Sequence, residues 1–346
     1  MSNFECYLRE IAEDIRNPDD PNNIRDFQTV KSYVLRILRL QDPYFNIIFQ
    51  KDILFGSLAH KVRIYNDDEA DVLMELRFPA YNLIKQVEDI KRPGFMFLDF
   101  SQACCDTMIA NHLANNKGRI LSQSKLRRWI DSIFTNALYN YGNVVHGIYE
   151  DYQLKYVWRG AAYTIQAVSH LRTFSIDFVP AVKIVCQTAG TWHAIPKSSN
   201  IAGHMHRYTF MISNVDAELQ HVARCGRKLK DVLRLLQAFR ISKNLPKLRC
   251  THFVNLAIWL STRMGYQTLY YMSVSDLFLQ MLYELCEAFY EGHLPYIWNC
   301  QMNLLGNFKE MEILQYHNEL LDAYTTLDSY PSQPALSYAR CLSHFE

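Results

Sequence analysis

Two acidic residues, one position apart, stand at the start of a segment with the pattern of a β-strand. In DDEADVLMEL, Glu69 and Asp71 share one face, because side chains two positions apart on a strand point the same way. The alternate residues from 70 to 76 are apolar and form the other face. If that apolar face is buried, the two carboxylates lie about 6 to 7 Å apart along the strand. This spacing suits two oxygen ligands of one divalent metal ion, and a solvated acidic strand face is the alternative.

A third acid, Asp177, interrupts an apolar strand-like segment, RTFSIDFVPAVKI. A carboxylate in such a segment is costly to bury unless it is paired or coordinates a cation. Its position is therefore consistent with a third metal ligand. A salt bridge with the nearby Arg172 is the alternative.

A Gly-Ser pair, Gly56 and Ser57, follows a strand-like segment upstream of these acids. Such a turn offers backbone N–H groups and a hydroxyl to phosphate oxygens. Gly-Ser, Glu-x-Asp and a distant strand Asp together form the pattern of the nucleotidyltransferase fold. In that chemistry, two Mg²⁺ or Mn²⁺ ions hold the attacking hydroxyl, the α-phosphate and the leaving pyrophosphate, and these hard cations require oxygen ligands. The sequence therefore predicts that Glu69, Asp71 and Asp177 are the metal ligands and the catalytic residues.

The rest of the chain predicts an α+β protein with two lobes. A long helix is expected up to residue 41, because apolar residues recur at i, i+3, i+4 and i+7 from residue 30. From about residue 215 the pattern is almost wholly helical. We therefore expect a bilobal nucleotidyltransferase fold, with a mixed-sheet catalytic lobe and its N-terminal spine helix at 1–205 and a helical lobe at 206–346. Strands are expected at 52–55, 61–65, 71–78, 95–100, 154–170 and 174–185, and helices at 120–140, 215–240, 249–264, 274–291 and 309–328.

The composition predicts a folded protein in a reducing compartment. Of the 346 residues, 49% are hydrophobic and 13% are aromatic, which is enough for a large core. The nine cysteines form no CxxC pair. The N-terminus has no apolar signal region, and no apolar run reaches the roughly 18 residues of a membrane span. We therefore expect a cytoplasmic chain with reduced thiols and no membrane insertion.

The net charge is only +1, but the basic residues are unevenly distributed. One group lies between residues 117 and 128 in a stretch without acids, and another lies between 224 and 249, where Asp231 is the only acid. Local clusters of this kind bind phosphates even in a near-neutral protein. Solvated helix faces are the alternative.

Four segments together resemble the cyclic GMP-AMP synthase-like receptors of the male-abnormal family. They are GSLAHKVRIYNDDEADVLMEL, GRILSQSKLRRW, IDFVPAV and YIWNCQMNLL, and together they cover roughly residues 50 to 310. The first segment includes the strand that the family has between its Gly-Ser and Glu-x-Asp motifs. The second segment resembles the family's GxILSxSK helix start. The ordered combination is far more specific than any one motif.

This resemblance implies roles for individual residues. Gly56 and Ser57 would hold a triphosphate, and Arg207 would contact a base. Arg234 takes the place of a Lys that contacts phosphate. Cys250-Thr251 stands where the family has Ser-Tyr, so the ring that stacks on a base is missing. The implied nucleotide-binding residues are Gly56, Ser57, Arg207, Arg234, Cys250 and Thr251.

The resemblance also implies a member of the family without a zinc-binding insertion. Where vertebrate cyclic GMP-AMP synthase has a His, Cys-Cys, Cys set, residues 208–228 contain only His221 and Cys225. Cys104-Cys105 and the His-x-His pair at 204–206 lack partners at ligand spacing, and structural zinc requires four N or S ligands. We expect no structural zinc, as in the insect-type receptors, for which double-stranded RNA is the known class of activator.

A nucleic-acid surface is implied along the spine helix and beside it. A zinc-free basic face suits duplex RNA, which is bound mainly through phosphates and 2′-hydroxyls. These positions contain neither the aromatic ladder of single-strand binders nor a DNA recognition helix. The predicted contacts are Arg25, Lys31, Arg36, Arg39, Lys117, Arg119, Lys125, Arg127 and Arg128.

The resulting hypothesis is an enzyme of innate antiviral signalling. On binding double-stranded RNA it would make a cyclic dinucleotide of the cyclic GMP-AMP type from ATP and GTP, and a homodimer on ligand binding is a further expectation. Two alternatives stay open: a catalytically silent member that only binds nucleotide or nucleic acid, and an RNA nucleotidyltransferase. The three acids favour an enzyme over the first, and the family-specific segments and helical half disfavour the second. The bases and linkage of the product depend on pocket geometry, which the sequence does not give.

Overall fold

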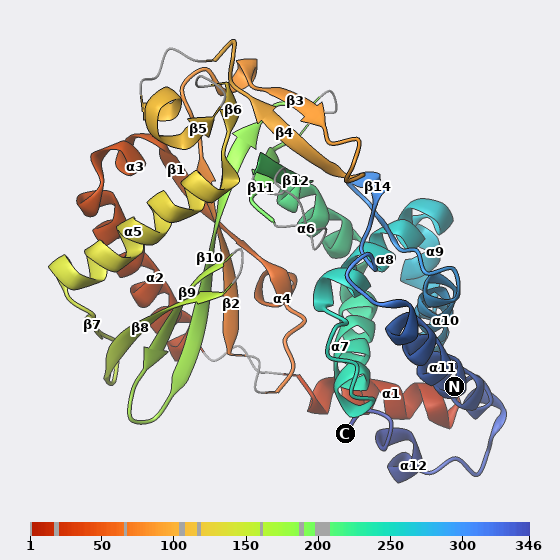
Figure 1. Cartoon of the computed structure of the whole chain (residues 1–346). Helices are drawn as coiled ribbons and strands as arrows, with labels where there is room; N and C mark the ends of the chain where they lie inside the picture. The colour runs from red at the N-terminus through yellow and green to blue at the C-terminus, as the bar shows by residue number, and fades with distance from the viewer. Residues whose placement is uncertain are drawn as a thin grey trace. The chain divides into compact units, whose positions relative to one another are not determined.

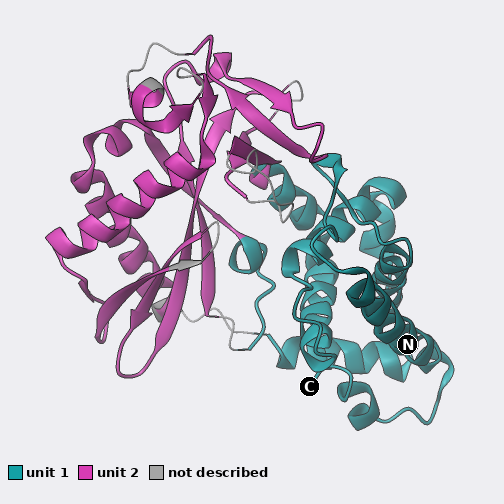
Figure 2. Ribbon diagram, viewed as in Figure 1, with its two compact units in different colours: residues 1–17, 56–67, 216–346 teal, residues 18–55, 68–215 magenta. Residues whose placement is uncertain are grey.

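The computed structural model describes residues 2–16, 21–65, 68–103, 108–115, 119–159, 162–186, 190–197 and 208–346. The chain forms two compact units (Figures 1 and 2). The sheet unit comprises residues 18–55 and 68–215. The helical unit comprises residues 1–17, 56–67 and 216–346.

The sheet unit contains one mixed sheet with twelve described strands. Its longest strand, β10, runs parallel to β2 and antiparallel to β9 and β11, so it has neighbours on both edges. Strand β1 extends the sheet beyond β2, and β12 and β4 extend it beyond β11. The strands are β1 (Phe49–Phe55), β2 (Glu69–Leu76), β3 (Lys85–Glu88), β4 (Phe95–Asp99), β5 (Ala114–Asn115), β6 (Ile120–Leu121), β7 (Val144–His146), β8 (Asp151–Arg159), β9 (Ala162–Val168), β10 (Thr173–Ile184), β11 (Trp192–Ile195) and β12 (Thr209–Ser213).

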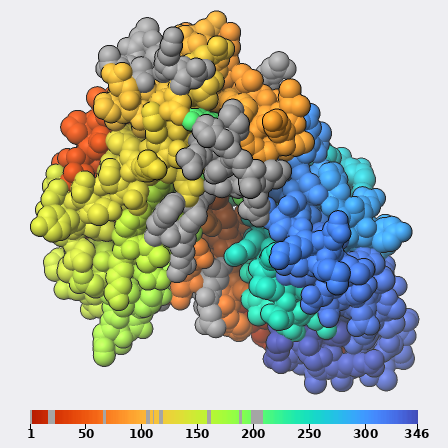
Figure 3. Space-filling model, viewed as in Figure 1, coloured from red at the N-terminus to blue at the C-terminus, as the bar shows by residue number. Residues whose placement is uncertain are grey.

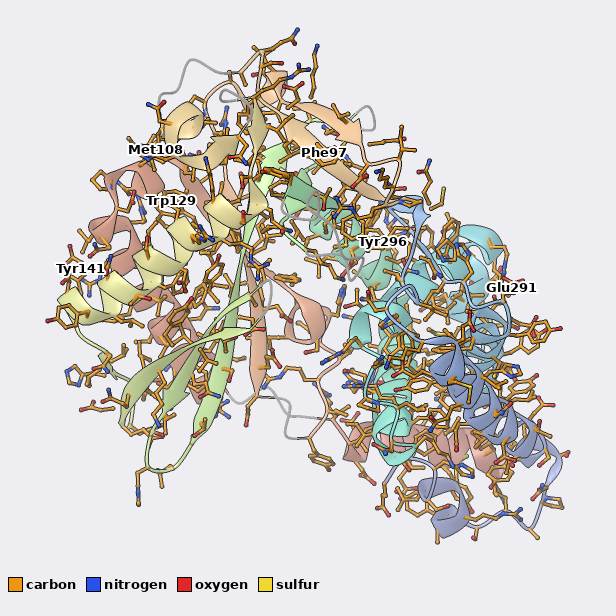
Figure 4. All side chains as sticks on the ribbon, in the orientation of Figure 1. Phe97, Met108, Trp129, Tyr141, Glu291 and Tyr296 are labelled. Atoms are coloured by element: carbon orange, nitrogen blue, oxygen red, sulfur yellow. The ribbon has the colours of Figure 1, made fainter. Side chains whose placement is uncertain are left out.

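Two long helices, α2 (Pro21–Gln41) and α5 (Gln123–Tyr141), pack against each other beside this sheet. Phe134 of α5 stacks on Tyr163 of β9, with ring centroids 5.2 Å apart. Trp129, labelled in Figure 4, donates its indole N–H to Asp42 Oδ2 at 3.0 Å, where α3 (Pro43–Ile48) begins. The outer side of α5 is the broad yellow area on the near face of Figure 3. The sheet unit also contains the short 3₁₀ helix η1 (Tyr81–Leu83) and the π-helix η2 (Ile109–Leu113).

The helical unit forms by the burial of one face of each of several amphipathic helices. Helix α1 (Asn3–Asp14) buries Phe4, Leu8 and Ile11 completely in a core that it shares with α7 and α10. The other elements are α4 (Gly56–His60), α6 (Val215–Arg224), α7 (Gly226–Ser242), α8 (Cys250–Met264), α9 (Tyr266–Tyr271), α10 (Val274–Tyr290), β13 (Pro295–Tyr296), β14 (Asn299–Asn303), α11 (Glu310–Asp328), η4 (Tyr330–Ser332) and α12 (Tyr338–Leu342).

The predicted α+β class is confirmed, and α2 is the long spine helix. The helix start predicted in GRILSQSKLRRW is also present, since Ser122 is the N-cap of α5 and accepts a bond from the Lys125 N–H. The strand predicted at 61–65 is wrong. Val62 and Ile64 are buried in the core of the helical unit, and the described segment makes only an isolated bridge from Ile64 to Arg16. Their alternation reflects contact with helices, not pairing in a sheet.

The single helix predicted at 215–240 is also wrong. It is interrupted between α6 and α7, because Gly226 has a φ of +81°. A left-handed residue cannot continue a right-handed helix, and glycine adopts that conformation without a Cβ clash.

The compact units differ from the contiguous lobes 1–205 and 206–346 that the sequence predicts. Helix α1 groups with the C-terminal helices because its apolar face packs on them. The sheet unit continues past residue 205 because β12 pairs with β4 and β11. None of the described helices combines the length and the apolar stretch that a membrane crossing needs.

Candidate active site

The parallel pairing of β2 with β10 brings three carboxylates together. Asp71 lies directly opposite Asp177 in the register, and Glu69 lies opposite Ser175. One carboxylate oxygen from each of Glu69, Asp71 and Asp177 lies within 4.8 Å of the others. Glu69 is exposed, while Asp71 and Asp177 are half-buried. The cluster therefore combines fixed strand positions with access for a ligand.

The two faces of β2 are divided as the alternation predicts. Ala70, Val72 and Met74 are at most 4% exposed, so one face of the strand is core. The carboxylates of Glu69 and Asp71 consequently lie on the opposite face. The acids of DDEADVLMEL thus lie on one face of the strand, and that face is open only at Glu69 and Asp71, because Leu73 and Glu75 on it are buried.

Asp177 is oriented by a neighbouring strand and not by an arginine. Thr164 lies opposite Asp177 in the pairing of β9 with β10, and its hydroxyl donates to Asp177 Oδ1 at 2.5 Å. Arg172 instead pairs with Asp68 at 3.1 Å and lies over the ring of Phe174. The alternative of an Asp177–Arg172 salt bridge is therefore wrong. Thr164 had no signal in the sequence, since a threonine in a strand is common.

Three clustered carboxylates are the donor set that Mg²⁺ and Mn²⁺ prefer, because both are hard cations with oxygen ligands. A buried site would exclude substrate, but two of these groups are half-buried and the third is exposed. The residues therefore fit a catalytic metal centre with positions open to phosphate oxygens.

The Gly56–Ser57 turn follows β1 directly. The last residue of β1, Phe55, lies opposite Asp71 in the antiparallel pairing of β1 with β2. Gly56 has a φ of +72°, a conformation in which any side chain would be strained, so the glycine is required by the turn. Ser57 then lies in the first turn of α4, whose bounds are Gly56–His60.

Two predicted nucleotide contacts occupy defined places in the helical unit. Arg234 is 5% exposed, and its guanidinium donates to Asp231 Oδ1 at 2.5 Å and to the Lys61 carbonyl at 2.7 Å. Cys250 and Thr251 form the first turn of α8. Arg207 lies outside the described residues. The nucleotide-binding roles of all these residues stay predictions.

Three of the predicted nucleic-acid contacts form polar bonds within the sheet unit. Lys31 forms an ion pair with Asp52 at 2.5 Å, and Arg119 forms one with Asp99 at 3.0 Å. Lys125 donates to the Ala114 carbonyl at 2.7 Å.

The other predicted contacts differ in exposure. Arg25, Arg36 and Arg39 are exposed on α2, and Arg39 donates to the Asn46 side chain. Arg128 is exposed and Arg127 is half-buried on α5. Lys117 lies outside the described residues.

The two zinc-ligand types between residues 208 and 228 are engaged in packing. The Tyr266 hydroxyl bonds to His221 Nδ1, and burial followed by the charge of Arg224 lowers the pKa of His221. Cys225 is 2% exposed, and burial raises the pKa of its thiol to about 11. The other candidates, Cys104-Cys105 and the His-x-His pair at 204–206, lie outside the described residues. The expectation of no structural zinc stays a prediction.

A buried ion cluster on the same face of β2 was missed by the sequence analysis. Glu75 is 2% exposed; it lies 2.9 Å from His193 Nε2 of β11 and 3.3 Å from Lys183 Nζ of β10. Burial by itself raises the pKa of Glu75, but the bond from His193 and the charge of Lys183 lower it below its ordinary value. The cluster links the two strands that carry the carboxylates to β11. An acid between Met74 and Leu76 was the available signal.

The part of the chain that contains the carboxylate cluster is similar to a known protein family. Residues 59–213 match the family described as "Mab-21 protein nucleotidyltransferase domain". The matched range contains all three carboxylates of the cluster. This part of the chain is a Mab-21 nucleotidyltransferase domain. The chain is therefore a nucleotidyltransferase, and the resemblance found in the four segments is confirmed.

Curated relatives of this chain include insect proteins. The chain is 26% identical over 355 residues to a "Cyclic GMP-AMP synthase-like receptor" of Lucilia cuprina, covering 95% of this chain and 93% of that protein. It is 25% identical to "Cyclic GMP-AMP synthase-like receptor 1" of Drosophila melanogaster, covering 77% of this chain and 76% of that protein. The similarity thus extends over both structural units.

Replacing Glu75 tests the buried cluster beneath the carboxylates. We expect Glu75→Gln to lower the free energy of unfolding by about 3 kcal/mol at pH 7, because it removes the buried charge that bonds to His193 and to the Lys183 ammonium. The folded pKa of Glu75 is depressed, so its contribution is present above the unfolded value and is lost as pH falls through the folded value. The difference between mutant and wild type should therefore shrink at acid pH.

Urea unfolding of both proteins at neutral and acid pH measures this difference. Glu88→Gln, an exposed change on edge strand β3, is the control and should alter stability by less than about 0.5 kcal/mol. An equal loss for Glu75→Gln at all pH values would contradict the assignment.

Proposed function

We propose that this nucleotidyltransferase makes a cyclic dinucleotide of the cyclic GMP-AMP type from ATP and GTP after binding double-stranded RNA. The observation that carries the catalytic part is the cluster of Glu69, Asp71 and Asp177 on adjacent strands. The names of the insect relatives support the receptor part. Innate antiviral signalling in the cytoplasm is the corresponding biological role. The seven cysteines in the described part of the chain are not joined in disulfides, in keeping with a reducing compartment.

In this proposal the three carboxylates hold two Mg²⁺ or Mn²⁺ ions. Such ions, when bound, supply charge stabilisation for an in-line displacement at phosphorus. The hydroxyl of one nucleotide attacks the α-phosphate of the other, and pyrophosphate leaves. Thr164 fixes the orientation of the Asp177 carboxylate. The Ser57 hydroxyl donates to a phosphate oxygen, and Gly56 lets the backbone approach the triphosphate closely.

The activator part rests on the exposed basic side chains of α2. Arg25 and Arg36 lie eleven residues apart, which is about three helical turns, and both are exposed. No carboxylate of the described ranges pairs with either guanidinium. Both are therefore available for phosphates, in contrast to Lys31, whose ammonium is held by Asp52. Contacts to phosphates alone would make binding insensitive to sequence and sensitive to salt.

Removing one ligand charge tests the metal centre. Asp71→Asn and Asp177→Asn should each abolish product formation, because each removes a ligand charge without changing side-chain volume. Asp68→Asn is the matched control, since Asp68 is a neighbouring acid that pairs with Arg172. Purified proteins are incubated with ATP, GTP and Mn²⁺, with and without duplex RNA, and the products are identified by mass. Near-normal synthesis by either ligand mutant would exclude this centre.

The same assay distinguishes the alternatives. A silent binding module would give no product with the wild-type protein under any condition. An RNA nucleotidyltransferase would lengthen the RNA without forming a cyclic dinucleotide.

Removing the Ser57 hydroxyl tests the phosphate contact. Ser57→Ala should raise the KM for nucleotide by roughly ten- to a hundredfold, because a hydrogen bond to a charged acceptor contributes about 1.5 to 3 kcal/mol. Arg207→Ala should raise the KM for nucleotide at least as much. Steady-state kinetics over a nucleotide range measures both. An unchanged KM for both mutants would place the nucleotide elsewhere.

Reversing charges on α2 tests the activator. Arg25→Glu combined with Arg36→Glu should weaken activation by duplex RNA and lower the salt slope of RNA binding by about two, one for each lost phosphate contact. Lys85→Glu with Lys91→Glu, at and near edge strand β3, changes the net charge equally and should have little effect. Synthesis without RNA should be equal in all variants. Activation by duplex DNA but not RNA would contradict the proposal.

A further inference from the structure

The segment that follows Ser57 ends α4 with a strained residue. Lys61 has a φ of +59°, a left-handed conformation in which glycine is usual at the end of a helix. Its N–H donates to the Leu58 carbonyl at 3.1 Å, and the Val62 N–H donates to the Ser57 carbonyl at 3.0 Å. These are the two bonds of a Schellman helix end. The backbone of Ser57 is therefore fixed by the residue that follows the strained lysine.

Helix α7 holds both residues of this helix end by their carbonyl groups. Arg234 donates to the Lys61 carbonyl at 2.7 Å, and Gln237 donates to the Val62 carbonyl at 2.6 Å. Arg234 is 5% and Gln237 is 3% exposed. Asp231, one turn earlier on α7, accepts from Arg234 at 2.5 Å and fixes its guanidinium. The bond to Val62 is buried and the bond to Lys61 is part-buried, so loss of the Gln237 bond would leave a buried carbonyl unpaired.

A third bond reaches the segment from α6. His60, the last residue of α4, lies 2.9 Å through Nε2 from Glu218 Oε1, and its side chain is 1% exposed. The carboxylate can only accept, so the ring carries its proton on Nε2. Two helices thus hold three consecutive residues, His60, Lys61 and Val62, by side-chain bonds.

We propose that Gln237, Arg234 and Glu218 are positioning residues that fix the Ser57 hydroxyl for phosphate binding. They act by stabilising the strained helix end. Without these bonds, Lys61 would seldom adopt the left-handed conformation that this helix end requires. The inference rests on the proposed phosphate contact of Ser57. It also gives Arg234 a role through the Lys61 carbonyl instead of the direct phosphate contact that the family resemblance implies.

Positioning has a defined kinetic consequence. A hydroxyl held in its bound geometry binds phosphate without a further loss of conformational freedom. Loosening the helix end should therefore raise the KM for nucleotide. It should leave the Mn²⁺ affinity of the carboxylates unchanged, because they are fixed by the register of β2 and β10.

Gln237→Met removes the Val62 bond with little change in volume. We expect a KM increase of about tenfold, the value of one buried hydrogen bond. Lys228→Met is the matched control: Lys228 also lies on α7 and donates to two backbone carbonyls, but those of Tyr270 and Met272. Thermal unfolding and Mn²⁺ titration of both variants separate positioning from loss of fold. An equal KM increase in the two variants would overturn the proposal.

A double-mutant cycle shows whether the effect passes through Ser57. In the Ser57→Ala background, Gln237→Met should cost less than about threefold in KM, because the hydroxyl that it positions is absent. Full additivity would overturn the proposal. If Ser57→Ala alone leaves KM unchanged, the phosphate contact fails. If Ser57→Ala raises KM and Gln237→Met does not, only the positioning inference fails.

Two further variants test the strained lysine and the arginine. Lys61→Gly removes the strain, so in the Gln237→Met background it should return KM toward the wild-type value. No recovery would count against the helix end as the link. Arg234→Lys should raise KM as Gln237→Met does, because one ammonium cannot reproduce the guanidinium bonds to Asp231 and Lys61. A wild-type KM for Arg234→Lys would instead support direct phosphate contact.

Discussion

The parallel register of β2 with β10 is the constraint on which the carboxylate cluster depends. It places Asp71 and Asp177 directly opposite each other, and it places Glu69 one pleat away. Three like charges repel when they are brought this close, so the arrangement is held by backbone bonds and by the buried apolar face of β2. A slip of one residue would turn the carboxylates into the core. The burial of Ala70, Val72 and Met74 therefore fixes the geometry of the carboxylate cluster and also contributes to stability.

Neighbouring residues stabilise two of the acids on these strands, Asp177 and Glu75, in different ways. At the exposed end of the face, Thr164 donates to Asp177 and leaves its negative charge intact. Deeper on the same face, Glu75 is neutralised by His193 and Lys183. If Glu75 had no positive partner, its charge would add to the repulsion among the three carboxylates. The strand face thus changes from an open anionic cluster to a paired buried cluster within four residues.

The basic side chains show a similar division between internal and external roles. Lys31 and Arg119 are used in ion pairs within the sheet unit, and Arg234 is used within the helical unit. Arg25 and Arg36 point to solvent from the spine helix. The same residue types therefore serve folding in some places and are available to an anionic partner in others. The exposure and the pairing of a basic side chain distinguish a role in folding from a role in binding. The number of basic residues nearby in the sequence does not.

The sequence by itself determined the fold class, the principal helices and strands, and the three carboxylates, because these depend on local periodicity and on the cost of an acid in an apolar strand. It identified the spine helix and the N-cap Ser122 for the same reason. It could not determine which partner an acid has. Asp177 bonds Thr164 instead of Arg172, and Glu75 bonds residues more than a hundred positions away. Nor could alternation at 61–65 distinguish a strand from an extended segment on a helical core. Those outcomes were decided by the tertiary structure, because strand register and helix packing bring distant residues into contact, and a local pattern contains no information about which residues these are.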